Sequence, residues 1–174
     1  MNEFRAAVEA GDFAGVGELL ADDVVFRSPI ASKPYEGKPI VAAIIRGVGR
    51  VFEDFRYVRE LADADGRGSA LVFETVVDGV SVNGIDLIRV NDAGLISELT
   101  VMVRPLSASN ALAQAMAAQF PQIQQEAIAA MRTRSDSRDT ISAHTIHLPT
   151  DRTEQLSQSP SSLGHRSGHP SGAT

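Results

Sequence analysis

One carboxylate stands among apolar residues where a chemical role is plausible. The stretch VNGIDLIRVNDAGLISELTVMV, residues 82 to 103, has the alternation of two strands joined by an Asn-Asp-Ala-Gly turn, and Asp86 lies within the first strand. Burial among apolar side chains disfavours the charged form of a carboxyl and raises its pKa. We therefore expect Asp86 to donate a hydrogen bond to a ligand oxygen or to exchange a proton with a ligand. The alternative is a structural acid, hydrogen-bonded to a neighbouring hydroxyl or to Ser28.

Other kinds of catalytic group are scarce. The chain has no cysteine, which excludes thiolate nucleophiles and disulfides, and its histidines all lie in the last part of the sequence: His144, His147, His165 and His169. The remaining proton-transfer groups of the folded part are carboxylates and the side chains of Tyr35, Tyr57, Lys33 and Lys38. His144 and His147 have a spacing that could bind a metal, but a solvated tail is the favoured interpretation. We predict no metal and no cofactor.

Composition and charge narrow the function classes. The net charge is −6 and no basic run is present, so nucleic acid is not an expected partner. No apolar run reaches the ~18 residues of a membrane span, and the N-terminus lacks the features of a signal peptide. These observations predict a cytoplasmic protein.

The composition changes near residue 132. Residues 1–131 hold nearly all large apolar side chains, whereas residues 132–174 are rich in Ser, Thr, Arg, Gly and Pro and contain no aromatic residue. Such a segment buries too little apolar area to offset the entropy of ordering it. We predict one domain over 1–131, which includes a C-terminal helix, and a disordered tail over 132–174.

The order of elements predicts an α+β fold. Two short helices precede a strand at 24–29, a polar loop at 30–37 and a helix that has Pro39 in its first turn. Four extended segments then follow at about 54–63, 69–78, 80–90 and 95–104, and a last helix is interrupted at Pro121. The economical arrangement is a curved antiparallel sheet wrapped over the N-terminal helices.

Both faces of that sheet are substantially apolar. Val82, Gly84, Asp86 and Ile88 alternate with Ile85, Leu87 and Arg89, and the neighbouring strands behave alike. Because antiparallel sheets usually leave one face polar, something must cover the second face. We predict a homodimer through the outer face, in which interspersed charges fix the register: Glu74, Arg89, Glu98 and Arg104. The alternative is that the C-terminal helix of the same chain crosses that face.

Three segments carry a resemblance to a known family. GDFAGVGELLADDVVFRSP, YEGKPIVAAIIRGV and GIDLIRVNDAGLISELTVMV resemble the SnoaL-like, or polyketide cyclase-like, branch of the nuclear transport factor 2-like superfamily, over about residues 3–105. The resemblance implies a cone-shaped, cystatin-like roll with a pocket between the concave sheet face and the helices. This fold carries isomerases, hydrolases, cyclases and non-catalytic binders alike.

The hairpin around Asp86 is similar to that of ketosteroid isomerase. The resemblance implies that Asp86 is the protonated acid of an oxyanion hole. Other parts of that site are missing: Phe4 stands where the oxyanion tyrosine is expected, and Ser28 stands where the catalytic base precedes the strand-ending proline. The epoxide hydrolase pattern also fails, because Gly84 replaces its arginine.

Two hypotheses follow. The first is a SnoaL-like binding domain for a small apolar ligand, with one inward carboxyl. The second is a cofactor-independent cyclase, isomerase or dehydratase in which Asp86 acts as acid–base or oxyanion donor on a carbonyl-bearing apolar substrate. In both, we expect the ligand to contact Phe26, Ser28, Tyr35, Phe52, Phe55, Phe73, Val101 and Val103.

Overall fold

The computed structural model describes residues 2–144, which form four helices and six strands. The helices are α1 (Asn2–Glu9), α2 (Phe13–Glu18), α3 (Lys38–Val51) and α4 (Leu106–His144). The strands are β1 (Leu20–Arg27), β2 (Tyr35–Glu36), β3 (Glu53–Ala62), β4 (Gly68–Val77), β5 (Val80–Val90) and β6 (Ile96–Arg104). The predicted α+β class is confirmed, and the short strand β2 lies inside the segment that was predicted as a loop.

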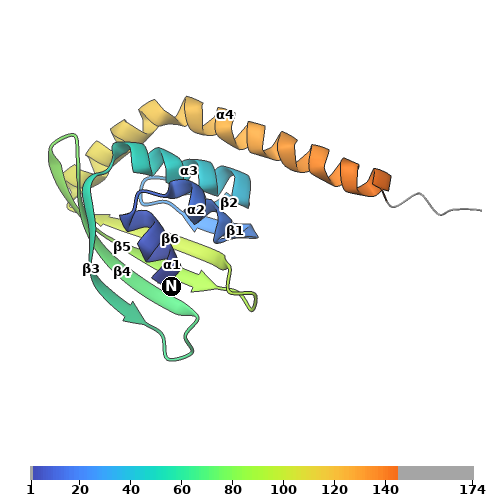
Figure 1. Ribbon diagram of the computed structural model, residues 1–174. Helices are drawn as coiled ribbons and strands as arrows, with labels where there is room; N and C mark the ends of the chain where they lie inside the picture. Colours follow the sequence, from blue (N-terminus) through green and yellow to red (C-terminus); the bar gives the residue numbers. More distant parts are fainter. Residues whose placement is uncertain (1, 145–174) are drawn as a thin grey trace, which may run out of the picture.

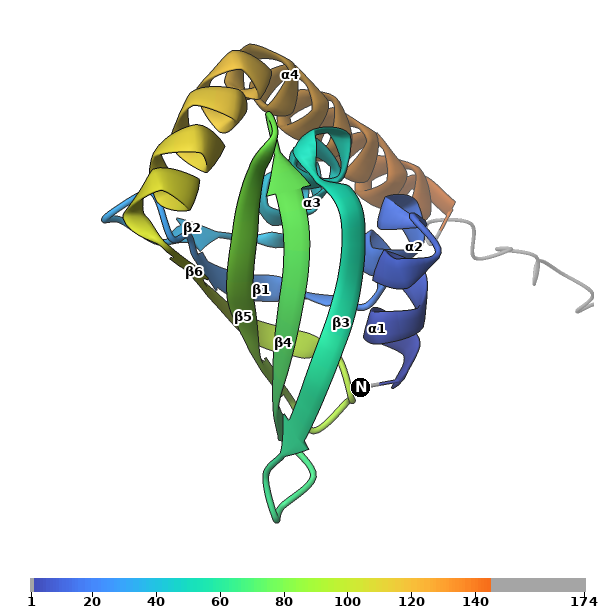
Figure 2. The same ribbon diagram turned by 90° about the vertical axis from the view of Figure 1, so that its left-hand side faces the viewer.

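The six strands form one curved sheet in the order β2-β1-β6-β5-β4-β3. The meander of β3, β4, β5 and β6 is antiparallel as predicted, and β1 and β2 are also antiparallel, whereas β1 and β6 run parallel. The reason lies in chain order: β1 comes before the four-strand meander and joins its far edge at β6 after the crossover through α3. The sheet bends around the helices, which lie on its concave side (Figures 1 and 2).

Local sequence signals set the ends of several elements. The Asp12 side chain accepts a hydrogen bond from the Gly15 backbone N–H at 2.8 Å and so caps α2. The β4–β5 hairpin turns at Asp78 and Gly79, whose φ angles are 48° and 77°. This pair of positive φ angles is the geometry of the tight turns that suit the twist of a hairpin.

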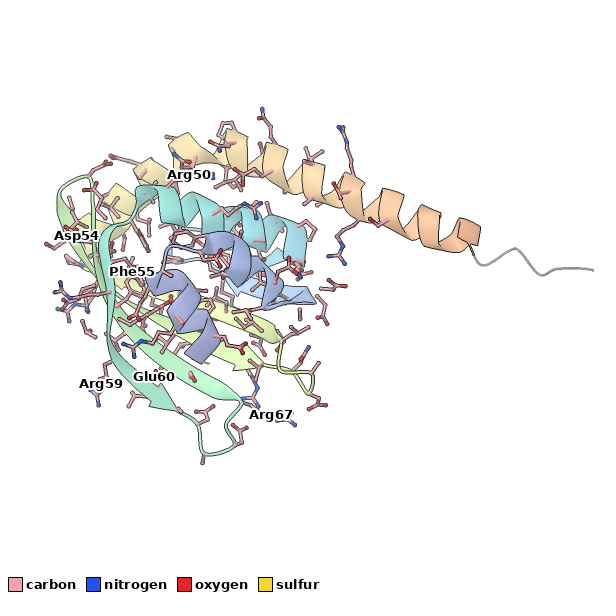
Figure 3. All side chains as sticks on the ribbon, viewed as in Figure 1. Arg50, Asp54, Phe55, Arg59, Glu60 and Arg67 are labelled. Atoms are coloured by element: carbon pink, nitrogen blue, oxygen red, sulfur yellow. The ribbon has the colours of Figure 1, made fainter. Side chains whose placement is uncertain are left out.

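The concave face of the sheet is the buried one. On β4, Leu71, Phe73, Thr75 and Val77 are buried and alternate with half-buried residues that face outward. On β5 the buried set is Val82, Gly84, Asp86 and Ile88, as the alternation predicts. On β3, Phe55 points toward the helices and Arg59 points away from them (Figure 3).

Helix α4 differs from its prediction in two ways. It is continuous through Pro121, and it extends to His144, the last described residue, instead of to about residue 131. Buried residues on both sides of the proline, Met116 and Ile123, hold the helix against the domain, and the helix bends without ending (Figure 1). No Gly or Pro occurs from residue 122 to 144, so nothing in this stretch stops the helix. The rest of the predicted tail, 145–174, lies outside the described residues.

Helix α4 packs against α3 on the concave side. Arg46 and Arg50 of α3 both pair with Glu126, at 2.8 and 2.9 Å. Gly47 allows close approach, because a Cβ atom there would lie 2.6 Å from Ile123 Cδ1. The alternative that the C-terminal helix covers the outer sheet face is therefore wrong. Within residues 2–144, no helix is both long and apolar enough to cross a membrane.

Candidate functional site

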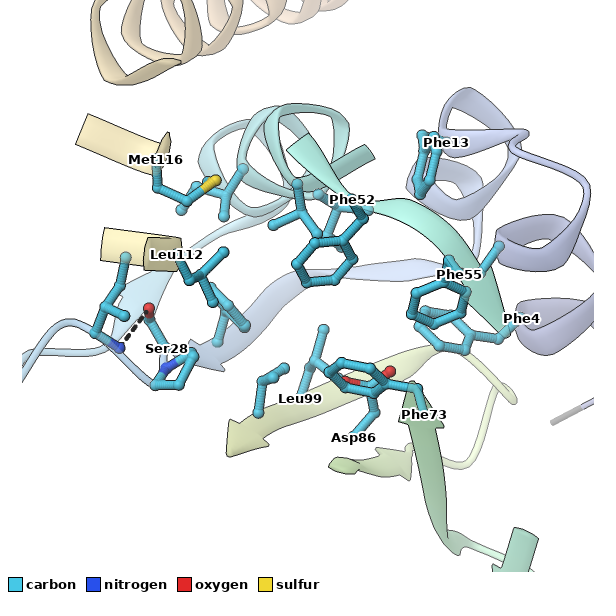
Figure 4. Close-up of a pocket in the computed structure, with 18 of the residues that line it drawn as sticks. Phe4, Phe13, Ser28, Phe52, Phe55, Phe73, Asp86, Leu99, Leu112 and Met116 are labelled. Atoms are coloured by element: carbon cyan, nitrogen blue, oxygen red, sulfur yellow. Dashed lines mark hydrogen bonds between the residues drawn. The ribbon is translucent and has the colours of Figure 1, made fainter. Parts of the chain in front are cut away.

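A cavity of about 80 Å³ lies between the concave sheet face and the helices. Its walls come from all layers of the fold: α1 and α2 contribute Phe4 and Phe13, and α4 contributes Leu112 and Met116. Ser28, Leu112 and Met116 lie toward one end of the cavity and Phe4 and Phe13 toward the other, as Figure 4 shows. Among the residues that line it, the charged group is Asp86.

Asp86 is held by a tyrosine that the sequence did not single out for this role. The Tyr57 hydroxyl donates a hydrogen bond to Asp86 Oδ2 at 2.7 Å, and both residues are buried, Tyr57 with 6% and Asp86 with 8% exposure. Within residues 2–144, no buried side-chain oxygen that is closed off from solvent lacks a hydrogen-bond partner. The Oδ1 atom of Asp86 has no hydrogen-bond partner among these residues, so it is not closed off from solvent. It therefore opens onto the cavity that Asp86 lines.

Strand pairing explains how Tyr57 reaches Asp86. Tyr57 pairs with Phe73 on β4, and Phe73 pairs with Gly84 on β5, two residues before Asp86. Because Phe73 is buried on the concave face, its partner Tyr57 faces the same way, and the register of β3 shifts on either side of the Arg56–Tyr57 pairs. The guanidinium of Arg5 lies 5.9 Å from the centre of the Tyr57 ring and covers it from α1.

Gly84 makes room for the aromatic wall. A Cβ atom at this position would lie 2.2 Å from Cζ of Phe73, so the Phe73 ring lies directly over the glycine. The Phe73 ring in turn contacts Phe52, Phe55 and Tyr57, with ring centres 5.3 to 6.5 Å apart. A glycine on the buried face of a central strand therefore has a packing cause.

Burial dominates the electrostatics of the pair. It raises the pKa of Asp86 to about 7, although the hydrogen bond from Tyr57 opposes this shift. Burial, followed by the charge of Asp86 and the hydrogen bond to it, raises the pKa of Tyr57 far above its ordinary value, so the phenol stays protonated. Near neutral pH the pair thus holds either one or two protons. When the pair holds two protons, one is on the Tyr57 phenol and the other is on the Asp86 carboxyl. The Oδ2 atom of that carboxyl already accepts the hydrogen bond from Tyr57.

The structure brings most of the expected ligand contacts together. Phe26, Ser28, Phe52, Phe55, Phe73 and Val101 line the same cavity as Asp86. Tyr35 does not line it and stacks on Phe26 at its edge, with ring centres 6.2 Å apart. Val103 pairs with Gly84 in the sheet and also lies outside the lining. The hydroxyl that bonds Asp86 is that of Tyr57 and not that of Ser28, whose Oγ accepts a hydrogen bond from the Ile30 N–H at 3.3 Å.

The structure has a tyrosine donor to Asp86, which the sequence comparison with ketosteroid isomerase counts as missing. Phe4 of α1 does line the cavity, but the tyrosine comes from β3. The available signal was the spacing of Phe55 and Tyr57, which places both on one face of a strand. The pairing of β3 with β4 could not be derived from spacing alone, because irregularities in β3 shift the register between the two strands.

The described residues offer no metal site. No group of three or more potential ligands of the His, Cys, Asp or Glu type occurs within 2–144. Of the His144–His147 pair, His147 and the side chain of His144 lie outside what the structure describes.

The fold and sequence have known relatives. A solved steroid delta-isomerase from Pseudomonas aeruginosa is 43% identical, with a TM-score of 0.68, over 71% of this chain and 90% of that one. An uncharacterized cystatin-like protein from Silicibacter pomeroyi is 34% identical, with a TM-score of 0.64, over 72% and 92%. SalBIII, an epoxide hydrolase/cyclase-like enzyme in pyran ring formation in salinomycin, is 16% identical, with a TM-score of 0.52, over 60% and 88%, and shares the fold.

No curated protein matches the sequence. The model of the SnoaL-like domain matches residues 1–99, more than half of the chain. Together with the two relatives above 30% identity, this match confirms the resemblance that the sequence motifs suggest. The chain belongs to the SnoaL-like domain family, within the nuclear transport factor 2-like superfamily.

Proposed function

We propose that the cavity binds a small, uncharged, mainly apolar molecule and places one of its oxygen atoms against Asp86. The observation that carries this proposal is the asymmetry of the carboxyl: Tyr57 bonds Oδ2, and Oδ1 is left to the cavity. The other lining groups are overwhelmingly apolar, so a ligand gains most of its binding energy from buried surface and its orientation from this one polar contact.

The protonation state of Asp86 decides which ligand oxygen it accepts. When the carboxyl is neutral, its proton on Oδ1 can be donated to a carbonyl oxygen. When it is ionised, Oδ1 can accept a hydrogen bond from a hydroxyl. A pKa of about 7 places the change between these two modes near neutral pH.

The cavity volume restricts ligand size. One water needs roughly 10–15 Å³ on this measure of volume, so a cavity of about 80 Å³ holds a handful of waters. A ligand of one or two rings fits such a space, whereas a four-ring steroid requires further room.

The binding proposal is tested with 1-indanone, a two-ring ketone, titrated by calorimetry between pH 5 and pH 9. The ketone should bind the native protein below pH 7 and lose affinity above it. Asp86→Asn should bind at every pH through its amide N–H, and Asp86→Val should bind weakly throughout. Equal affinity for all three proteins, with no pH dependence, would exclude the carboxyl from the site.

A second candidate function is isomerisation by acid–base catalysis. It is favoured by the coupling of an acid of near-neutral pKa to a protonated tyrosine, and by the 43% identity to a steroid delta-isomerase. Ionised Asp86 would take a proton from the carbon between a ketone and a C=C bond, and the resulting acid would return it to the far alkene carbon. The double bond moves into conjugation, and no atom is gained or lost.

This second function has its own assay. Cyclohex-3-enone fits the cavity by size, and its conversion to cyclohex-2-enone raises ultraviolet absorbance. Asp86→Asn should abolish turnover and keep ketone binding. Binding of 1-indanone with no turnover of cyclohex-3-enone would favour the non-catalytic function.

We also propose that two copies of the chain associate through the outer sheet face. Helix α4 leaves this face uncovered, and Leu61 and Met102 are 49% and 50% exposed on it. Charges of both signs lie among them: Arg56 pairs with Glu74, and Arg27 pairs with Glu98 at 3.2 Å. A face of this kind is self-complementary across a two-fold axis. Light scattering should give a dimer mass, and Met102→Glu should give a monomer.

A further inference from the structure

A second cavity lies between the chain after β1 and helix α4. Its volume is about 200 Å³, and two of its lining residues, Tyr35 and Phe120, contact each other with ring centres 6.4 Å apart. Small residues of α4, Ala113 and Ala117, form its floor. Ala117 is exposed, so this outer cavity is reached from the surface.

The outer cavity and the Asp86 cavity share a wall. Ser28, Ile30, Ile44 and Met116 line both of them. Ser28 and Met116 lie at the same end of the inner cavity, opposite the end that Phe4 and Phe13 close (Figure 4). The outer cavity therefore lies beyond the end of the inner one that is nearer to α4.

Helix α4 leads from one cavity to the other. Leu112 lines only the inner cavity, Met116 lines both, and Phe120 lines only the outer one. Residues four apart lie on the same helix face and about 6 Å apart along the axis. The path from Leu112 to Phe120 thus spans about 12 Å.

Met116 is suited to a movable partition. Its side chain is unbranched and has three rotatable bonds, so it changes conformation more readily than a branched side chain of similar size. It is 7% exposed and stands where the two cavities meet. Ile30, which also lines both cavities, is 36% exposed and comes from the segment after β1.

We propose that the two cavities form one elongated binding site, through which the ligand enters and along which it extends, with Met116 as the partition. This inference rests on the proposed function, because it takes the Asp86 carboxyl as the contact for the ligand oxygen. Asp86 is the charged residue among those that line the two cavities. The fitting ligand is uncharged, carries an oxygen at one end, and has an apolar chain or further ring that reaches toward Tyr35 and Phe120.

The test uses 4-alkylcyclohexanones of increasing chain length, titrated by calorimetry at pH 5.5. In the native protein, affinity should rise roughly four-fold for each added methylene that enters the outer cavity. Ala117→Phe fills the outer cavity from an exposed position, so the protein should fold normally. It should weaken the 4-pentyl ketone at least ten-fold and leave cyclohexanone unchanged.

Ala118→Phe is the matched control. Ala118 is exposed and adjacent to Ala117, and it lines neither cavity, so the same added ring should change neither affinity. Met116→Ala should keep or increase the affinity for the 4-pentyl ketone. The elongated site would be overturned if Ala117→Phe and Ala118→Phe changed the affinities equally, or if affinity did not rise with chain length. In either case, binding of cyclohexanone would still uphold the proposed function. Failure of every ketone to bind, cyclohexanone included, would overturn both.

Discussion

Replacing Asp86 by Asn should stabilise the protein at high pH and change little at low pH. The folded state holds the pKa of this carboxyl at about 7, whereas the ordinary pKa of an aspartate, which applies to the unfolded chain, is 3.8. Below pH 3.8 both states are protonated; between the two values only the unfolded chain loses its proton, so stability falls as pH rises. The total loss is roughly 4 kcal/mol, reached just above pH 7. An asparagine at this position cannot ionise, so the variant does not lose stability in this way.

The assay is urea denaturation of the two proteins from pH 4 to pH 8, followed by far-ultraviolet circular dichroism because the chain has no tryptophan. Every other carboxylate is common to both proteins, so the difference between their free energies of unfolding isolates Asp86. That difference should grow by roughly 4 kcal/mol in favour of Asp86→Asn over this range. Parallel curves would refute the raised pKa. A variant that is less stable at pH 8 would mean that the carboxylate itself holds the fold together.

Three further predictions follow from the same contacts. Tyr57→Phe removes the hydrogen bond that lowers the Asp86 pKa, so the midpoint of the carboxyl titration should move above 7. Carbon-13 NMR follows this titration, and an unchanged midpoint would contradict the hydrogen bond between Tyr57 and Asp86. Gly84→Ala should cost about 1–3 kcal/mol in chemical denaturation, because the Phe73 ring must move, and an unaffected variant would show that the ring has space. Deleting 132–174 removes the exposed ion pair between Arg134 and Asp22, worth about 0–1 kcal/mol, so the melting temperature should change by at most a few degrees.

Much of the fold follows from sequence pattern because local signals decide it. The alternation on β4 and β5 separates buried from exposed residues, and the Asp78-Gly79 turn specifies the hairpin between them. The end of α4 could not be derived in this way. Composition predicts a change near residue 132, but a helix already held by Ile123 and Ala127 extends until something stops it.

The candidate site is less accessible to sequence reasoning, because it depends on register between strands far apart in the chain. Asp86 stands out as a lone carboxyl in an apolar strand. Its partner Tyr57 does not, since a tyrosine that follows a phenylalanine at strand spacing is typical of ordinary core packing. The order β5-β4-β3 and the pairing of Tyr57 with Phe73 place the hydroxyl on the carboxyl. Tyr35, chosen for its place near the pocket mouth, lines the outer cavity instead.

The loss of folding stability that the buried Asp86 carboxyl causes is itself an argument that it binds a ligand. A single hydrogen bond from Tyr57 does not offset the burial, since the pKa stays raised in its presence. A structural role would be served better by a neutral side chain, which could accept the same hydrogen bond without any loss of stability above pH 4. A group that weakens the fold, faces a cavity and changes protonation near neutral pH is typical of functional sites. The gain in stability of Asp86→Asn and its loss of turnover or of pH-dependent ketone binding should therefore occur together. A variant that gained stability and bound ketones with the native pH profile would break this link.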